Sequence, residues 1–139
     1  MTATASPHLG QVHALLAERG YEVSETAPNT LKIREVDSGV AVQAVLVGDI
    51  CYFSLTCVIV SKDALTGDVT YQMLDAGNGI STSYFQLYDA GNHKVAVTLN
   101  KFCKLQEMGA DDEDDILSCV HFLLVDVMAA HRLVGHLGE

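Results

Sequence analysis

The acidic run at residues 111–115 is the densest group of potential metal ligands in the sequence. A calcium loop of the EF-hand type needs Gly at its sixth position and Glu at its twelfth. Counted from Asp111, these positions hold Ile116 and Phe122, so the run lacks the signature. Carboxylates in the first turn of a helix instead stabilise that helix, by about 0.3–1 kcal/mol each. We therefore interpret the run as a helix start and predict no metal and no cofactor.

Histidine and cysteine side chains could supply a nucleophile, but their spacing matches no known catalytic motif. The sequence has no H-E-x-x-H, no C-x-x-C, no G-x-S-x-G and no P-loop. Cys119 and His121 would point in different directions on a helix, although a Cys–His pair that meets only in the fold stays open. Reduced cysteine often behaves as a small buried hydrophobe. We interpret all four cysteines in this way: Cys51, Cys57, Cys103 and Cys119. We also predict that the protein is not an enzyme.

The charge balance argues against two classes of partner. The 139 residues include 8 Lys+Arg and 18 Asp+Glu, a net charge of −10. Nucleic acid and anionic membranes bind clustered basic residues, and the sequence has no such cluster, so we expect neither partner. The uncharged run Ile50–Ser61 is too short to cross a bilayer, and Met1–Ala5 lacks the features of a signal peptide. We expect one cytoplasmic domain spanning residues 1–139.

The apolar periodicity predicts an α+β fold with the element order α-β-β-β-α-β-β-α. Ser6-Pro7 is typical of a helix start, and the turn Pro28-Asn29 separates the first helix from three strands. Short turns between strands favour antiparallel pairing. We therefore predict a five-stranded antiparallel sheet from these segments: helix 7–19, strands 31–36, 40–47 and 50–60, a helical segment within 61–79, strands 81–88 and 93–99, and a helix over 111–134.

The last helix has more apolar residues than one buried face requires. Ser118, Asp126 and Arg132 are polar residues that we expect to mark its outward side. Four apolar residues fall within the same sector, and an exposed apolar patch suggests a second copy of the chain or a partner protein. The alternative is that the N-terminal helix or a loop covers them. The candidate protein-binding residues are Phe122, Val125, Ala129 and Leu133.

One stretch of the sequence resembles a known family. The segment Met73-Leu74-Asp75-Ala76-Gly77-Asn78 precedes a hairpin of residues 84–88 and 95–99, and a long amphipathic helix follows. Together they resemble the YbjN family of bacterial proteins, named as candidate sensory transduction regulators, whose fold is similar to that of type III secretion chaperones. The resemblance covers nearly the whole chain. Asn78 matches the family pattern, whereas Gly77 and Gly79 depart from it.

The resemblance implies a homodimeric, non-enzymatic, protein-binding fold of the type III secretion chaperone-like kind. Two functions follow as hypotheses. A regulatory or chaperone-like protein would accept a partner segment at an exposed sheet edge or apolar groove. An immunity or antitoxin-like protein would use its acidic surface to inhibit a basic enzyme, and its binding would weaken with salt.

Overall fold

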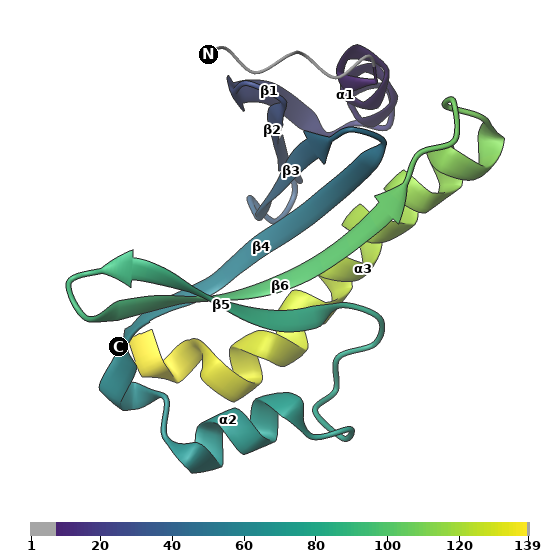
Figure 1. Ribbon diagram of the computed structural model, residues 1–139. Helices are drawn as coiled ribbons and strands as arrows, with labels where there is room; N and C mark the ends of the chain where they lie inside the picture. Colours follow the sequence, from purple (N-terminus) through teal and green to yellow (C-terminus); the bar gives the residue numbers. More distant parts are fainter. Residues whose placement is uncertain (1–7, 139) are drawn as a thin grey trace. The chain divides into compact units, whose positions relative to one another are not determined.

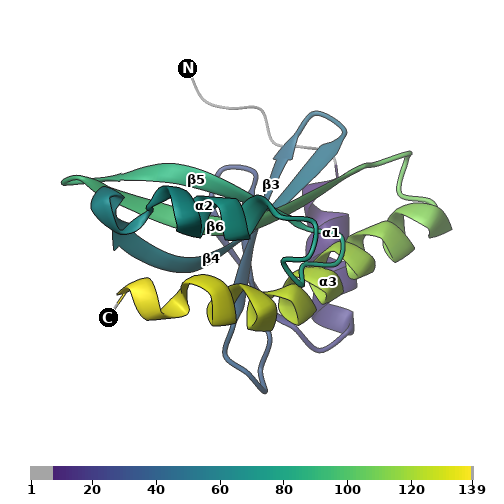
Figure 2. The same ribbon diagram turned by 90° about the horizontal axis from the view of Figure 1, so that it is seen from below.

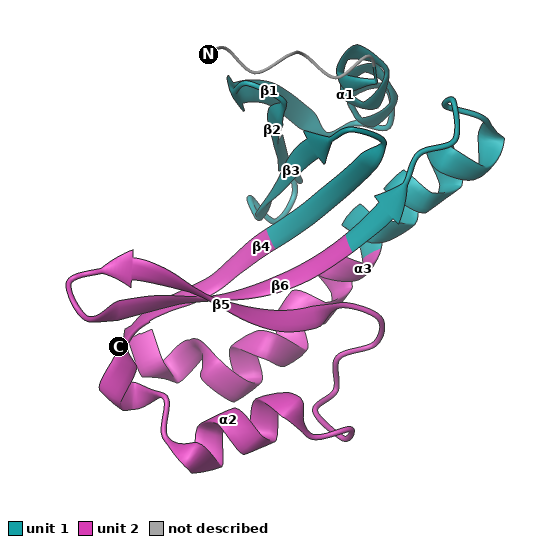
Figure 3. Cartoon of the chain, in the orientation of Figure 1, with its two compact units in different colours: residues 1–54, 102–121 teal, residues 55–101, 122–139 magenta. Residues whose placement is uncertain are grey.

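The computed structural model describes residues 8–138, which form two compact units. Unit 1 takes its residues from 1–54 and 102–121, and unit 2 from 55–101 and 122–139 (Figure 3). Three elements run from one unit into the other: β4 (Ile50–Ser61), β6 (Lys94–Lys104) and α3 (Ala110–Val134). The single domain expected over residues 1–139 stays a prediction.

Unit 1 combines a short helix with an antiparallel group of strands (Figure 1). Because side chains alternate along a strand, Leu31 and Ile33 are buried while Lys32 between them is exposed. β2 pairs with β1 and with β3, and β3 pairs with the first half of β4. The elements that lie wholly within this unit are α1 (Leu9–Glu18), β1 (Glu22–Ala27), β2 (Thr30–Arg34) and β3 (Ala41–Val47).

The two helices of unit 1 contribute apolar side chains to its core. Val12, Leu15 and Leu16 of α1 are buried and share one helical face. The predicted cap at Ser6-Pro7 lies outside the described residues. The acidic run does begin α3, and the carboxylate of Asp112 is buried and accepts a hydrogen bond from the backbone N–H of Gln106 at 2.6 Å.

Unit 2 is a β-hairpin covered by two helices. Its complete elements are η1 (Lys62–Ala64), α2 (Gly67–Leu74), β5 (Tyr84–Gly91) and η2 (Gly135–Gly138). In Figure 1 α2 and the last part of α3 lie below the β5–β6 hairpin, and in Figure 2, seen from below, α2 lies in front of it. The core joins four elements through Val60 of β4, Met73 of α2, Val97 of β6 and Val134 of α3.

The sheet has six strands in the order β1-β2-β3-β4-β6-β5, so the prediction of five strands is wrong by one. The antiparallel pairing is as predicted. The missed strand is β1, which pairs with β2 across the predicted turn at Pro28-Asn29. Its sequence, EVSETA, has only Val23 as an aliphatic residue larger than alanine, and five of its six side chains are exposed. An edge strand of this kind carries no alternating apolar pattern for sequence reasoning to find.

In unit 2, two elements expose large aliphatic side chains. In α2, Met73 is buried and Leu74 is exposed. In β4, Cys51, Phe53 and Leu55 are buried at odd positions, and then Ile59 is exposed while Val60 is buried. The buried face therefore changes phase within the strand.

The contrast between the two faces of unit 1 can be tested with a matched pair of phenylalanines. Phe53 is 1% exposed and Phe102 is 56% exposed. We expect Phe53→Ala to lower the free energy of unfolding by about 3–5 kcal/mol, because it removes a buried ring and leaves a cavity. Phe102→Ala should lower it by less than about 1 kcal/mol. Urea unfolding of both variants provides the measurement, and equal losses would contradict the assigned faces.

Candidate protein-interaction site

A buried carboxylate on α3 organises the loop that leads into β5. Asp126 is 2% exposed, and its Oδ1 accepts hydrogen bonds from the Ser81 N–H at 3.0 Å and the Ser81 hydroxyl at 2.8 Å. Its Oδ2 accepts from the Ser83 hydroxyl at 2.7 Å and from the backbone N–H groups of Thr82 and Ser83. The carboxylate thus holds residues 81–83 against the helix, immediately before β5 begins at Tyr84.

These donors set the ionisation of Asp126. Burial raises the pKa of this carboxyl, but hydrogen bonds from the hydroxyls and backbone N–H groups of Ser83 and Ser81 outweigh burial, so its pKa lies below the ordinary value. The carboxylate is therefore charged at neutral pH. The prediction that Asp126 marks the outward side of the helix is wrong, because the loop covers that side.

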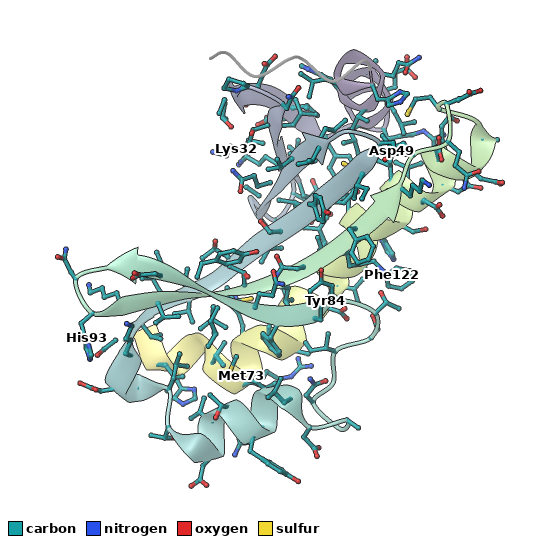
Figure 4. All side chains as sticks on the ribbon, in the orientation of Figure 1. Lys32, Asp49, Met73, Tyr84, His93 and Phe122 are labelled. Carbon is teal, nitrogen blue, oxygen red and sulfur yellow. The ribbon has the colours of Figure 1, made fainter. Side chains whose placement is uncertain are left out.

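The structure separates the four candidate binding residues of α3. Val125 is 48% exposed. Phe122 (labelled in Figure 4) is half-buried. The Lys101 Nζ lies 5.5 Å from the centre of its ring. Ala129 is buried and close to Gly79, where an added Cβ would lie 3.4 Å from the Ala129 Cβ. Leu133 packs against the core of unit 2.

The exposed apolar stripe of α3 lies next to the one expected from the sequence. Met128 is 66% exposed and stands three residues after Val125, so the two share one helical face. Arg132, one turn further, is also exposed. We call Val125 and Met128 the α3 pair. Met128 was not among the four candidate residues identified from the sequence.

β5 leaves a backbone edge open, because it is the last strand in the sheet order. Its residues 84–88, Tyr-Phe-Gln-Leu-Tyr, include no charge and no proline, and only Phe85 among them is half-buried. β1 is the other edge, and it carries Glu22 and Glu25. Charged residues on an edge strand discourage pairing with another chain. The β5 edge is therefore open to pairing with a strand of another chain, whereas the charged β1 edge disfavours such pairing.

No disulfide joins any two of the four cysteines, and the thiol pKa values of three of them are raised. Burial and the nearby Cys119 raise the pKa of Cys51 to about 12, and burial raises the pKa of Cys57 to about 11. A hydrogen bond with Cys119, with burial in addition, raises the pKa of Cys103. Thiols with raised pKa values are protonated at neutral pH and react slowly. Their predicted structural role fits these surroundings.

Residues 8–138 contain no group of three His, Cys, Asp or Glu side chains placed to hold a metal ion. In the same residues, one helical stretch, Ala110–Gly138, is long and apolar enough to cross a membrane. Length and composition alone do not separate such a helix from a core helix, and part of this one is buried inside the protein.

Charge divides unequally between the units. Unit 1 holds 12 of the 18 acidic residues and 4 of the 8 basic residues, so its net charge is −8 and that of unit 2 is −2. Unit 2 also carries the α3 pair and the uncharged edge of β5. Low charge beside exposed apolar side chains makes unit 2 the better candidate for an apolar protein contact.

The fold is an α+β fold similar to two solved structures. A chain of the heterodimeric ExoU–SpcU complex from the type III secretion system of Pseudomonas aeruginosa superposes with a TM-score of 0.58 and 19% identity, over 90% of this chain and 96% of that one. YbjN of E. coli, described as a candidate transcription regulator, gives a TM-score of 0.61 and 16% identity, over 91% and 94%. No family model and no curated protein matches the sequence. The predicted likeness in fold is confirmed.

The role of Asp126 can be tested through pH. We expect Asp126→Asn to lower the free energy of unfolding at pH 7 by about 1.5–3 kcal/mol, because several hydrogen bonds lose a charged acceptor. Since the folded pKa is lowered, the stability that the carboxylate contributes is present above the ordinary value of 3.8 and lost as the pH falls through the folded pKa. Urea unfolding between pH 2.5 and 7 measures the difference between the two proteins.

Asp75→Asn provides the control, because this exposed carboxylate accepts only the Gly77 N–H among the described hydrogen bonds. It should change the stability by less than about 1 kcal/mol. A difference between wild type and Asp126→Asn that stays constant down to pH 2.5 would contradict the assigned ionisation.

Proposed function

We propose that the chain is a non-enzymatic, protein-binding regulator or chaperone-like protein of the YbjN type that acts in the cytoplasm as a homodimer. The observation that carries this proposal is the set of exposed apolar and backbone groups on unit 2, the less charged unit. The fold likeness to a candidate regulator and to a chain of a secretion complex supports the same class of function.

The homodimer contact that we propose is the edge of β5. The segment Tyr84-Phe85-Gln86-Leu87-Tyr88 reads nearly the same in both directions around Gln86. If two copies pair antiparallel with Gln86 on the two-fold axis, Tyr84 lies opposite the partner's Tyr88 and Phe85 lies opposite the partner's Leu87. Aromatic and aliphatic cross-strand pairs stabilise a sheet by about 0.2–1 kcal/mol each. The edge is thus complementary to itself.

The α3 pair is then the proposed contact for a different protein. Val125 and Met128 present apolar surface, and Phe122, three residues before Val125, lies half-buried beside them. The proposed contact keeps Phe122 and Val125 from the four residues identified from the sequence. Ala129 and Leu133 support it from inside unit 2. An amphipathic segment of a partner could cover the pair.

Gln86→Lys tests the dimer contact. The substitution places two like charges opposite each other on the two-fold axis, which disfavours pairing. We expect wild type to sediment as a dimer at micromolar concentration and the variant to be a monomer with an unchanged far-UV spectrum. Ala90→Lys, at an exposed position of β5 outside residues 84–88, adds the same charge and should leave the dimer intact. A wild-type protein that is monomeric up to millimolar concentration would refute the proposal.

Val125→Glu tests the partner contact. Proteins captured from native cell extract by the tagged wild type should be lost with this variant, because a carboxylate in an apolar contact is costly to desolvate. Gln72→Glu adds the same charge at an exposed position of α2 and should retain them. Both variants should sediment as dimers. Equal capture by the two variants would exclude the α3 pair.

The acidic inhibitor remains a second candidate because of one observation, the net charge of −8 on unit 1. Binding of that kind would fall steeply between 50 and 500 mM salt, since opposite surface charges are screened. Capture that depends on Val125 and is insensitive to salt favours the regulator or chaperone-like function.

A further inference from the structure

The sheet of unit 1 has a second face that none of its described helices covers. On β2, β3 and β4 the side chains that alternate with the buried ones point to this face, which we call the open face. Its apolar members are Val45, Val47, Tyr52 and Phe102. Val45 pairs with Tyr52 across β3 and β4, and the Tyr52 and Phe102 rings lie 6.0 Å apart. Tyr52 is 44% exposed and Phe102 is 56% exposed, so an aromatic pair lies open to solvent.

The open face collects the positive charge of an otherwise acidic unit. Three of the four basic residues of unit 1 lie there: Lys32, Arg34 and Lys104. Arg34 contacts Glu22 at 2.9 Å, and Lys104 lies 3.9 Å from Asp49. Exposed ion pairs of this kind contribute about 0–1 kcal/mol, so a new carboxylate can replace the existing one. The described ion pairs leave the ammonium group of Lys32 without a carboxylate (Figure 4).

A hollow at the β1–β2 end of this face has room for a carboxylate. It encloses about 220 Å³ and is lined by Glu22, Val23, Ser24, Lys32 and Arg34. Lys32 pairs with Gln43 of β3, two residues along the strand from the Val45–Tyr52 row. Because adjacent strands lie about 4.8 Å apart, the hollow and the aromatic pair are separated by roughly 10–12 Å. An extended chain covers this distance in three or four residues.

We propose that the open face binds an extended segment of a partner protein in which a carboxylate lies three or four residues from an aromatic side chain. The carboxylate enters the hollow beside Lys32, and the aromatic ring packs on Tyr52 and Phe102. This inference rests on the proposed protein-binding function for the class of occupant, but it uses a surface of unit 1 and not the α3 pair or the β5 edge.

Charge decides between this occupant and two others. A nucleic-acid strand would bring a phosphate for every base to a unit of net charge −8, where Lys32 is the one cation of the open face that lacks a described ion-pair partner. A second copy would bring another −8 with its own unit 1. A segment with one carboxylate beside an aromatic ring satisfies both the ammonium group and the exposed rings.

The test uses labelled twelve-residue peptides in a Gly-Ser background that carry Asp and Phe three positions apart. We expect fluorescence anisotropy to show saturable binding, weakened at least tenfold when either the Asp or the Phe of the peptide is replaced by Ser. Lys32→Glu and Phe102→Ala should each weaken binding at least tenfold. Lys62→Glu makes the same charge change at an exposed position of unit 2 and should leave binding unchanged. Val125→Glu should also bind normally, which separates this site from the α3 pair.

Thermal melts confirm that each variant is folded before its binding is compared. Equal binding by wild type, Lys32→Glu and Phe102→Ala would overturn the proposal, as would equal binding of the peptide without Phe. Two further results would show that the open face binds a different ligand. Binding of oligothymidylate that Lys32→Glu abolishes would assign the face to nucleic acid, and a change in sedimentation caused by Lys32→Glu would assign it to a second copy.

Discussion

A buried carboxylate needs hydrogen-bond donors, and in unit 2 these donors come from the segment that joins α2 to β5. Asp126 meets it with the hydroxyls and N–H groups of residues 81–83. The same contacts fix where the irregular segment after α2 stops and β5 starts. One ionised side chain therefore holds the segment that leads into the open strand edge against α3.

The sequence predicted the elements that bury one face. It did not predict the surroundings of a side chain whose hydrogen-bond donors come from a distant segment. Helix and strand signals are local properties, so the sequence predicted α1, β2 and β3 to within a few residues of their bounds. The place of Asp126 depends on a loop 45 residues earlier in the chain, which no helical periodicity reveals. The run Ser81-Thr82-Ser83 was the available signal, since consecutive hydroxyl residues before a strand can serve as donors. β1 was missed because a polar edge strand leaves no apolar period.

The division of charge gives the two units different chemistry. Unit 1 carries its carboxylates mainly on its turns and helices, while three of its four cations lie on the uncovered side of its strands. Unit 2 is almost neutral and exposes apolar groups. A protein that holds more than one partner benefits from this arrangement, because contacts of unlike chemistry do not compete. Electrostatic contacts respond to salt, and apolar contacts respond little.

The unlike ends of the sheet also decide how far an assembly can grow. An edge that pairs with its own copy around a two-fold axis is used up when two chains have joined. Growth beyond that point would need the opposite edge to accept a strand, and there Glu22 and Glu25 stand on a short β1 interrupted by a bulge before Ala27. If copies of the chain join through β5, the open edge and the edge guarded by charge would limit the assembly to a closed pair, whereas two open edges would produce a fibre.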